Sequence, residues 1–213
     1  MNLLGVTSRF MTNLRARFQA PVDTTRPRGT RLIEAYSAKL QRRVRLFDHS
    51  SFAQWIRLEA DPTVITFCER PVRIGPQRDA RLVDFWMGAL SGEEMLLLEP
   101  RPFEGVPSQL DDVAIRVIVP AELAAASVWI SNWSCMLPVI NATRNLVPRS
   151  LLGAVLDHVC GPISLGRLEH ELSVGDPSLI RGAIFEQLRN GRIRAPSLHT
   201  KLLSLHAVLE PAS

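Results

Sequence analysis

Arginines that could contact phosphate are concentrated near the start of the chain. Residues 1–47 carry ten basic and two acidic side chains, although the whole chain has a formal net charge of only +4. Positive charge gathered in one segment suits contacts with nucleic-acid phosphates, and such contacts weaken steeply with salt. The alternative is a flexible arm that only keeps the protein soluble. The candidate DNA-binding residues of this segment are Arg26, Arg28, Arg31, Arg42, Arg43 and Arg45.

The remaining composition excludes several classes of protein and of site. Apolar residues make up 46% of the 213 residues, which is enough for a packed core. No apolar run approaches the roughly 18 residues that a membrane-spanning helix requires, and the N-terminal residues carry no secretory cleavage signature. Cys68, Cys135 and Cys160 form no CxxC or His-rich pattern. We therefore expect reduced core cysteines in an intracellular protein, and no zinc site.

Residues 31–147 have the pattern of an α/β domain. A helical apolar face is predicted for residues 52–59, and Ser91-Gly92 is a hairpin signal. Proline, threonine and glycine cluster before Arg31, so residues 1–30 are expected to form a basic flexible arm. The predicted strands are 63–68 with a short extension at 71–74, then 81–90, 94–99 and 114–119, and a further helix is predicted for 122–133.

Residues 148–213 predict three short helices followed by a two-stranded ribbon, which is the element order of a winged helix. Asp176-Pro177 is a strong start for the third helix, because aspartate caps the first turn and proline fits the first helical position. Asn190-Gly191 should end that helix. Apolar and polar residues alternate from Leu203 to Leu209, as they do in a strand.

A winged helix offers its last helix and its wing to DNA. The candidate contacts in this domain are Arg181, Arg189, Arg192, Arg194 and Lys201. Basic and acidic residues nearly balance over residues 148–213, which also suits the docking of a partner protein. Both uses of the domain stay open on the sequence.

A series of short motifs runs through the first domain. A predicted helix ends in Leu58-Glu59-Ala60-Asp61-Pro62, and a strand ends in Glu69-Arg70-Pro71. Then come Val83-Asp84-Phe85 and an apolar strand that ends in Glu99. This order resembles the N-terminal nuclease domain of TnsA-like heteromeric transposase endonuclease subunits. The resemblance covers residues 31–210, because a winged helix at the C-terminus also fits the layout of that family.

The resemblance implies an α/β fold, with a restriction-endonuclease-like mixed sheet and flanking helices, followed by a winged-helix domain. In such a site two carboxylates hold Mg²⁺, and the metal activates water for attack on a phosphodiester. Asp84 matches the first carboxylate and Glu99 the second, so both are expected to be catalytic and metal-binding. Arg101 stands where a lysine is expected, and arginine is a poor proton acceptor because it stays charged. Ser51 stands where a helical glutamate is expected.

The resemblance further implies a role in DNA transposition. Such a protein would bind double-stranded DNA and cut transposon ends beside an integrase-type transposase and an AAA+ ATPase regulator, in the bacterial cytoplasm near the nucleoid and away from membranes. The missing lysine and glutamate favour weak or lost cleavage. The alternative is a non-catalytic scaffold that binds DNA and docks partner proteins. A third hypothesis, a transcription regulator with a sensor domain, would need a ligand pocket and a dimer interface, and no sequence signal indicates either.

Overall fold

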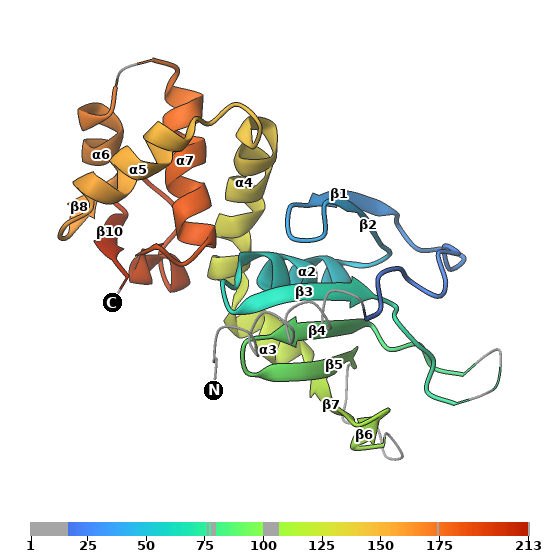
Figure 1. Cartoon of the computed structure of the whole chain (residues 1–213). Helices are drawn as coiled ribbons and strands as arrows, with labels where there is room; N and C mark the ends of the chain where they lie inside the picture. Colours follow the sequence, from blue (N-terminus) through green and yellow to red (C-terminus); the bar gives the residue numbers. More distant parts are fainter. Residues whose placement is uncertain (1–16, 76, 78–79, 100–106, 174, 213) are drawn as a thin grey trace, which may run out of the picture. The chain divides into compact units, whose positions relative to one another are not determined.

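The computed structural model describes residues 17–75, 77, 80–99, 107–173 and 175–212 (Figure 1). The chain divides into two compact units: unit 1 consists of residues 1–59 and 63–124, and unit 2 of residues 60–62 and 125–213. Helix α4 (Ser127–Thr143) belongs to unit 2, where it packs against α7 (Pro177–Arg189). The expected boundary at residue 148 therefore falls within unit 2, after α4.

Unit 1 is a mixed α/β unit built on a five-stranded sheet with flanking helices. The strand order is β3-β4-β5-β7-β6, in which β4 is antiparallel to β3 and β5 while β7 runs parallel to β5. The mixed sheet and flanking helices predicted from the sequence are confirmed. The elements are α2 (His49–Ala60), β3 (Val64–Glu69), β4 (Phe85–Ala89), β5 (Gly92–Leu98), β6 (Gln109–Leu110), β7 (Val113–Ile118) and α3 (Pro120–Ala125).

Strands β3 and β4 of this sheet are buried on both faces, which explains why they are almost continuously apolar. Successive side chains of a strand point to opposite faces, yet Phe85 and Trp86 are both essentially inaccessible, at 1% and 0% exposure. Phe18 packs beside Trp86, with ring centroids 5.3 Å apart. The amide of Val22 donates to the carbonyl of Arg70 at 3.0 Å. Part of the segment predicted to be a flexible arm is thus held against the sheet.

A short hairpin that was not predicted from the sequence precedes the sheet. Its strands β1 (Ile33–Ser37) and β2 (Arg42–Leu46) are antiparallel. Glu59, only 1% exposed near the end of α2, holds the turn of this hairpin. It accepts hydrogen bonds from the Ser37 hydroxyl at 2.6 Å and from the Lys39 amide at 3.1 Å. Arg43 and Arg45 of β2 are exposed, whereas Val44 and Leu46 are buried, so the segment is a strand as well as a basic stretch.

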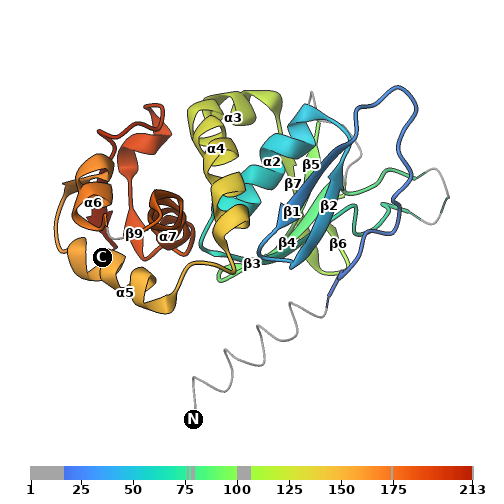
Figure 2. The same ribbon diagram turned by 90° about the horizontal axis from the view of Figure 1, so that it is seen from above.

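The described residues of unit 2 form four α-helices, which are labelled in Figure 2, and a small antiparallel sheet with the strand order β8-β10-β9. Strand β8 lies between two helices in sequence and was not predicted. After α4, the elements are α5 (Arg149–His158), β8 (Ile163–Ser164), α6 (Leu165–Glu171), α7 (Pro177–Arg189), β9 (Ile193–Arg194), the 3₁₀ turn η1 (Pro196–His199) and β10 (Val208–Pro211).

Helix α7 begins and ends where the sequence predicts. The Asp176 carboxylate accepts the Ser178 amide at 2.8 Å, and Pro177 occupies the first turn, where a missing N–H costs no helical bond. Gly191 has a φ of +68° just beyond the helix, a conformation that glycine adopts without strain. These local signals are sufficient to predict both ends of α7, because capping depends only on neighbouring residues.

The strand predicted for Leu203–Leu209 is wrong over most of its length. Only β10 is extended, and Leu205 is 54% exposed. The reason is a distant side chain, the buried amide of Asn132 in α4. Its Nδ2 donates to the carbonyls of Leu198 and Lys201, and its Oδ1 accepts the amide of Leu203, with all three distances 2.8–2.9 Å. These bonds hold the segment as a loop.

Two smaller predictions also differ from the structure. The helix expected for 122–133 is divided at Ala126 into α3 and α4, and α4 continues to Thr143 through Pro138. Of the three cysteines expected in the core, Cys68 is buried, whereas Cys135 and Cys160 are exposed. All three are free thiols.

The contact between α4 and α7 provides a stability prediction. A Cβ on Gly182 would overlap Thr143 Oγ1 and would lie 2.9 Å from Thr143 Cβ, closer than carbon atoms pack. Gly182→Ala should therefore lower the free energy of unfolding by about 1–2 kcal/mol, despite the better helix propensity of alanine. The measurement is urea unfolding followed by circular dichroism.

Gly153→Ala is the matched control for this substitution. Gly153 lies in α5, and a Cβ added to it would meet no atom of the described residues within 4 Å. This control should be stabilising by roughly 0.5–1 kcal/mol. Equal effects of the two substitutions would contradict the close approach of α4 and α7.

Candidate functional site

The sheet of unit 1 brings Asp84 and Glu99 to the same end of two neighbouring strands. Asp84 directly precedes β4, and Glu99 directly follows β5. Since β4 and β5 are antiparallel, with Phe85 opposite Leu96, the start of one strand lies beside the end of the other. The amide of Asp84 donates to the carbonyl of Leu96 at 3.1 Å, which extends the ladder to the site. The two carboxylates predicted from the sequence are therefore neighbours.

Arg81 bridges these two carboxylates, a role that was not predicted from the sequence. Its Nη2 donates to Asp84 Oδ2 at 2.7 Å, and its Nε donates to Glu99 Oε1 at 2.9 Å. The amide of Leu98 also donates to Asp84 Oδ2 at 2.8 Å. A three-residue spacing from Asp84 was the only signal for Arg81 in the sequence, and it is a weak one. We call Asp84, Glu99 and Arg81 the acidic site.

The acidic site has unusual electrostatics because its two carboxylates are largely covered, with side-chain exposures of 19% for Asp84 and 22% for Glu99. Burial raises the pKa of Asp84 to about 6, although the charge of Arg81 and the Leu98 amide act in the opposite direction. Burial also disfavours the charged form of Arg81, but its bonds to Asp84 and Glu99 outweigh this effect and raise the Arg81 pKa above its usual value. The site is thus an arginine neutralised by two carboxylates.

The donor set of the acidic site does not fit Mg²⁺ in this arrangement. Mg²⁺ is usually held by one or two carboxylates together with water, but the carboxylates of Asp84 and Glu99 are both bonded to the guanidinium of Arg81, which occupies oxygens that the ion would need. Over the described part of the chain, no group of three or more His, Cys, Asp or Glu side chains could hold a metal ion. Arg101, the third predicted catalytic residue, lies outside the described residues.

Ser51 and Glu59, which lie on the preceding helix, both have structural roles. Ser51, at the position where a glutamate was expected, lies in the first turn of α2. Its amide and its hydroxyl donate to the Asp48 carboxylate at 2.7 and 2.8 Å, which stabilises the start of that helix. Glu59 is occupied by the β1-β2 turn, so it does not supply the missing carboxylate.

Several predicted DNA-binding arginines are engaged in ion pairs. On α7, Arg181 donates to both oxygens of Glu169 at 2.6 and 2.8 Å, and Arg189 pairs with Glu186 at 2.7 Å. These pairs reduce the positive charge that α7 offers to DNA. The predicted contacts that are exposed and form no ion pair within the described part of the chain are Arg26, Arg28, Arg31, Arg43, Arg192, Arg194 and Lys201.

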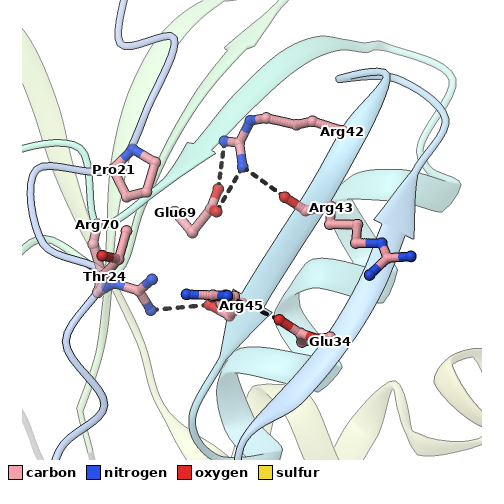
Figure 3. Close-up of a pocket in the computed structure, with 8 residues that line it drawn as sticks. All are labelled: Pro21, Thr24, Glu34, Arg42, Arg43, Arg45, Glu69 and Arg70. Atoms are coloured by element: carbon pink, nitrogen blue, oxygen red, sulfur yellow. Dashed lines mark hydrogen bonds and ion pairs between the residues drawn. The ribbon is translucent and has the colours of Figure 1, made fainter.

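Arg42 and Arg45 line a basic pocket beside the β1-β2 hairpin (Figure 3). The pocket has a volume of about 290 Å³. Arg42 forms a fork with Glu69, with N–O distances of 2.7 and 2.6 Å, and Arg45 pairs with Glu34 at 2.9 Å. We call this cavity the hairpin pocket, and its lining residues are Pro21, Thr24, Glu34, Arg42, Arg43, Arg45, Glu69 and Arg70.

Unit 2 contains a wider and more apolar groove among α5, α6 and α7. Its volume is about 500 Å³, and its lining includes Leu151, Leu172, Leu179 and Ile180. Glu171 and Asp176 also line it, so the apolar surface is accompanied by negative charge. This composition is unsuited to a DNA phosphate and suits an apolar or basic partner better.

Comparison with known proteins finds no family model and no curated protein that matches the chain. Among the described residues, no helix is both long enough and apolar enough to span a bilayer. The acidic site and the hairpin pocket therefore have to be interpreted from their own chemistry.

The pKa of Asp84 predicts a pH-dependent stability. The folded protein holds this proton up to about pH 6, whereas an unfolded aspartate releases it near pH 3.9. The folded state therefore loses stability relative to the unfolded chain as pH rises between these two values. Asp84→Asn is neutral throughout, so its free energy of unfolding relative to wild type should increase by on the order of 2 kcal/mol from pH 4 to pH 7.

Urea unfolding at pH 4, 5, 6 and 7 measures this difference. Asp157→Asn is the matched control, because it also removes one carboxylate but at an exposed position of α5. A constant difference between Asp84→Asn and wild type over this range would contradict a raised pKa of the partly buried Asp84.

Proposed function

We propose that the protein is a DNA-binding subunit of a transposition complex, related to TnsA-like endonuclease subunits, and that it does not cleave DNA itself. The absence of cleavage is inferred mainly from the position of Arg81 between Asp84 and Glu99. A guanidinium at this place supplies the positive charge that a metal ion would otherwise supply to two carboxylates.

The arrangement of unit 1 supports the nuclease-like ancestry in this proposal. A helix precedes three antiparallel strands, and a later strand pairs in parallel with the third of them. The resemblance assigns the two carboxylates to the ends of β4 and β5, and the sheet brings these ends together. The missing helical glutamate and the arginine bridge favour a site that has lost its metal.

The order of elements in unit 2 supports a winged-helix assignment. Three helices, with β8 after the first, precede β9 and β10, and β10 pairs with both other strands. The proposed wing between β9 and β10 exposes Arg194 and Lys201. Because the arginines of α7 are paired with glutamates, the proposed DNA contact of unit 2 lies on this wing rather than on α7.

Mg²⁺-dependent cleavage beside an integrase-type transposase is the second candidate. The adjacency of Asp84 and Glu99 favours it, since these are the carboxylates that such chemistry requires. An AAA+ ATPase regulator would be a further partner under either candidate. The two candidates differ in the role of Arg81 and in the outcome of a cleavage assay.

Arg81→Gln tests whether the Arg81 guanidinium occupies the place of a metal ion between the two carboxylates. Removing the guanidinium leaves two neighbouring carboxylates without a counter-ion, so Mn²⁺ affinity at pH 7.5 should rise by about tenfold or more over wild type. Titration calorimetry or the Mn²⁺ resonance signal measures this. The double substitution Arg81→Gln, Asp84→Asn is the control and should not show this increase in Mn²⁺ affinity. Equally tight Mn²⁺ binding by wild type would contradict the proposed role of Arg81.

Duplex DNA binding and cleavage can be tested together. The wild type should bind duplex DNA with a strong salt dependence and should leave it intact in Mg²⁺ or Mn²⁺, with or without the transposase. Replacing Arg26, Arg28 and Arg31 by glutamine should reduce the slope of log K against log salt by up to about 3, because each phosphate contact contributes roughly 0.9.

The control for this triple variant replaces three arginines outside the proposed contacts, namely Arg116, Arg149 and Arg167, and so matches the change in charge. Its slope should change less than that of the first variant. Metal-dependent cleavage that is lost in Asp84→Ala would overturn the non-catalytic proposal in favour of the second candidate.

A further inference from the structure

The hairpin pocket has more positive than negative groups in its wall. Four arginines and two glutamates line it. Each glutamate already pairs with one arginine: Glu69 with Arg42, and Glu34 with Arg45. Two guanidinium groups therefore have no carboxylate partner within the lining. An anion in this pocket would balance the remaining charge.

Arg70 is held rigidly beside the pocket. Its Nε donates to the Asp23 carbonyl at 2.6 Å, its Nη1 donates to the Arg45 carbonyl at 3.0 Å, and its guanidinium carbon lies 4.5 Å from the centre of the Phe47 ring. Its Nη2 is buried and has no hydrogen-bond partner in the described part of the chain. Since its other two nitrogens are already engaged and this one is inaccessible, Arg70 contributes positive charge to the pocket wall rather than an open donor.

The backbone of Arg70 is also strained. Its φ of +47° lies in the left-handed region, which non-glycine residues seldom adopt. Such strain persists only where surrounding contacts fix the conformation, and it is concentrated at functional sites. Together with its three contacts, it indicates that the Arg70 side chain is positioned before any ligand arrives.

Arg45 is the arginine best placed to bind an anion. Its side chain is 53% exposed, and only its Nε is engaged, by Glu34, so both terminal nitrogens are available to donate among the described contacts. Figure 3 shows Arg45 and Arg70 close together on one side of the hairpin. Thr24 lines the same side, and the exposed arginines 26, 28 and 31 follow it in the chain.

We propose that the hairpin pocket is a phosphate-binding site, that Arg45 is its main donor while Arg70 adds positive charge to its wall, and that it takes a backbone phosphate of duplex DNA. This inference rests on the proposed DNA-binding function and names its contact site in unit 1. Glu34 acts as a competitor, because it occupies one nitrogen of Arg45 in the free protein.

Two substitutions with opposite expected effects test the proposal in the full-length protein. Arg45→Gln should raise the Kd for a duplex about five- to tenfold and lower the slope of log K against log salt by about 0.9. Glu34→Gln should lower the Kd, because it frees Arg45. A merely damaged hairpin would weaken binding in both variants. Fluorescence anisotropy with a labelled duplex at several salt concentrations is the measurement.

Arg116→Gln is the matched control, since Arg116 lies on β7 and is exposed and paired with Glu122. It should leave the affinity within about twofold of wild type, as expected for loss of an exposed charge outside the contact. A second readout is the thermal stability of each protein in inorganic phosphate and in chloride at equal ionic strength. Phosphate should stabilise wild type more than Arg45→Gln.

The outcomes separate this proposal from the function on which it rests. Wild-type DNA binding with unchanged affinity and slope in both hairpin variants would overturn the pocket while leaving DNA binding intact. Stabilisation by phosphate without DNA binding would overturn DNA as the source of the phosphate and, with it, the proposed function. If the wild type shows neither DNA binding nor stabilisation by phosphate, both the phosphate-binding pocket and the proposed function are overturned.

Discussion

The buried carboxylate of Glu69 imposes the constraint on which much of unit 1 depends. It lies at the end of β3 with 2% exposure, where an unpaired charge would be strongly destabilising. The fork of Arg42 satisfies both of its oxygens and fixes β2 beside β3. Because the hairpin is held there, Arg45 and Arg70 come to face one cavity. The hairpin pocket is thus a consequence of how one acidic residue is neutralised.

The same pairing of carboxylate and arginine determines the chemistry of the acidic site. Arg81 neutralises Asp84 and Glu99 as Arg42 neutralises Glu69, and only two of the 25 basic residues of the chain are lysines. Arginine suits this use because its planar fork matches a carboxylate and stays charged when partly buried. It is a poor proton acceptor for the same reason. The composition therefore agrees with a binding function better than with general-base chemistry.

Local signals in the sequence were sufficient where structure depends on neighbouring residues. Asp176, Pro177 and Gly191 define α7, and Ser91-Gly92 lies at the turn between β4 and β5. Interactions across long stretches of sequence were not predictable in this way. Asn132 changes a predicted strand into a loop through bonds to residues 198–203, and nothing near those residues indicates it. Phe18 joins the core through Trp86, although its own segment has the composition of a flexible arm.

The mixed α/β character of unit 1 and the limits of α7 were predictable from short segments, because strand periodicity and helix caps are local properties. Asp84 and Glu99 were singled out by the family resemblance. The contacts that these two acidic residues make became known from the three-dimensional arrangement of the chain. Arg81 lies between the carboxylates, and Arg70 lies beside a pocket whose wall comes from three separate segments. Which charges neutralise one another is a question of distance in space, and the order of residues along the chain does not specify it.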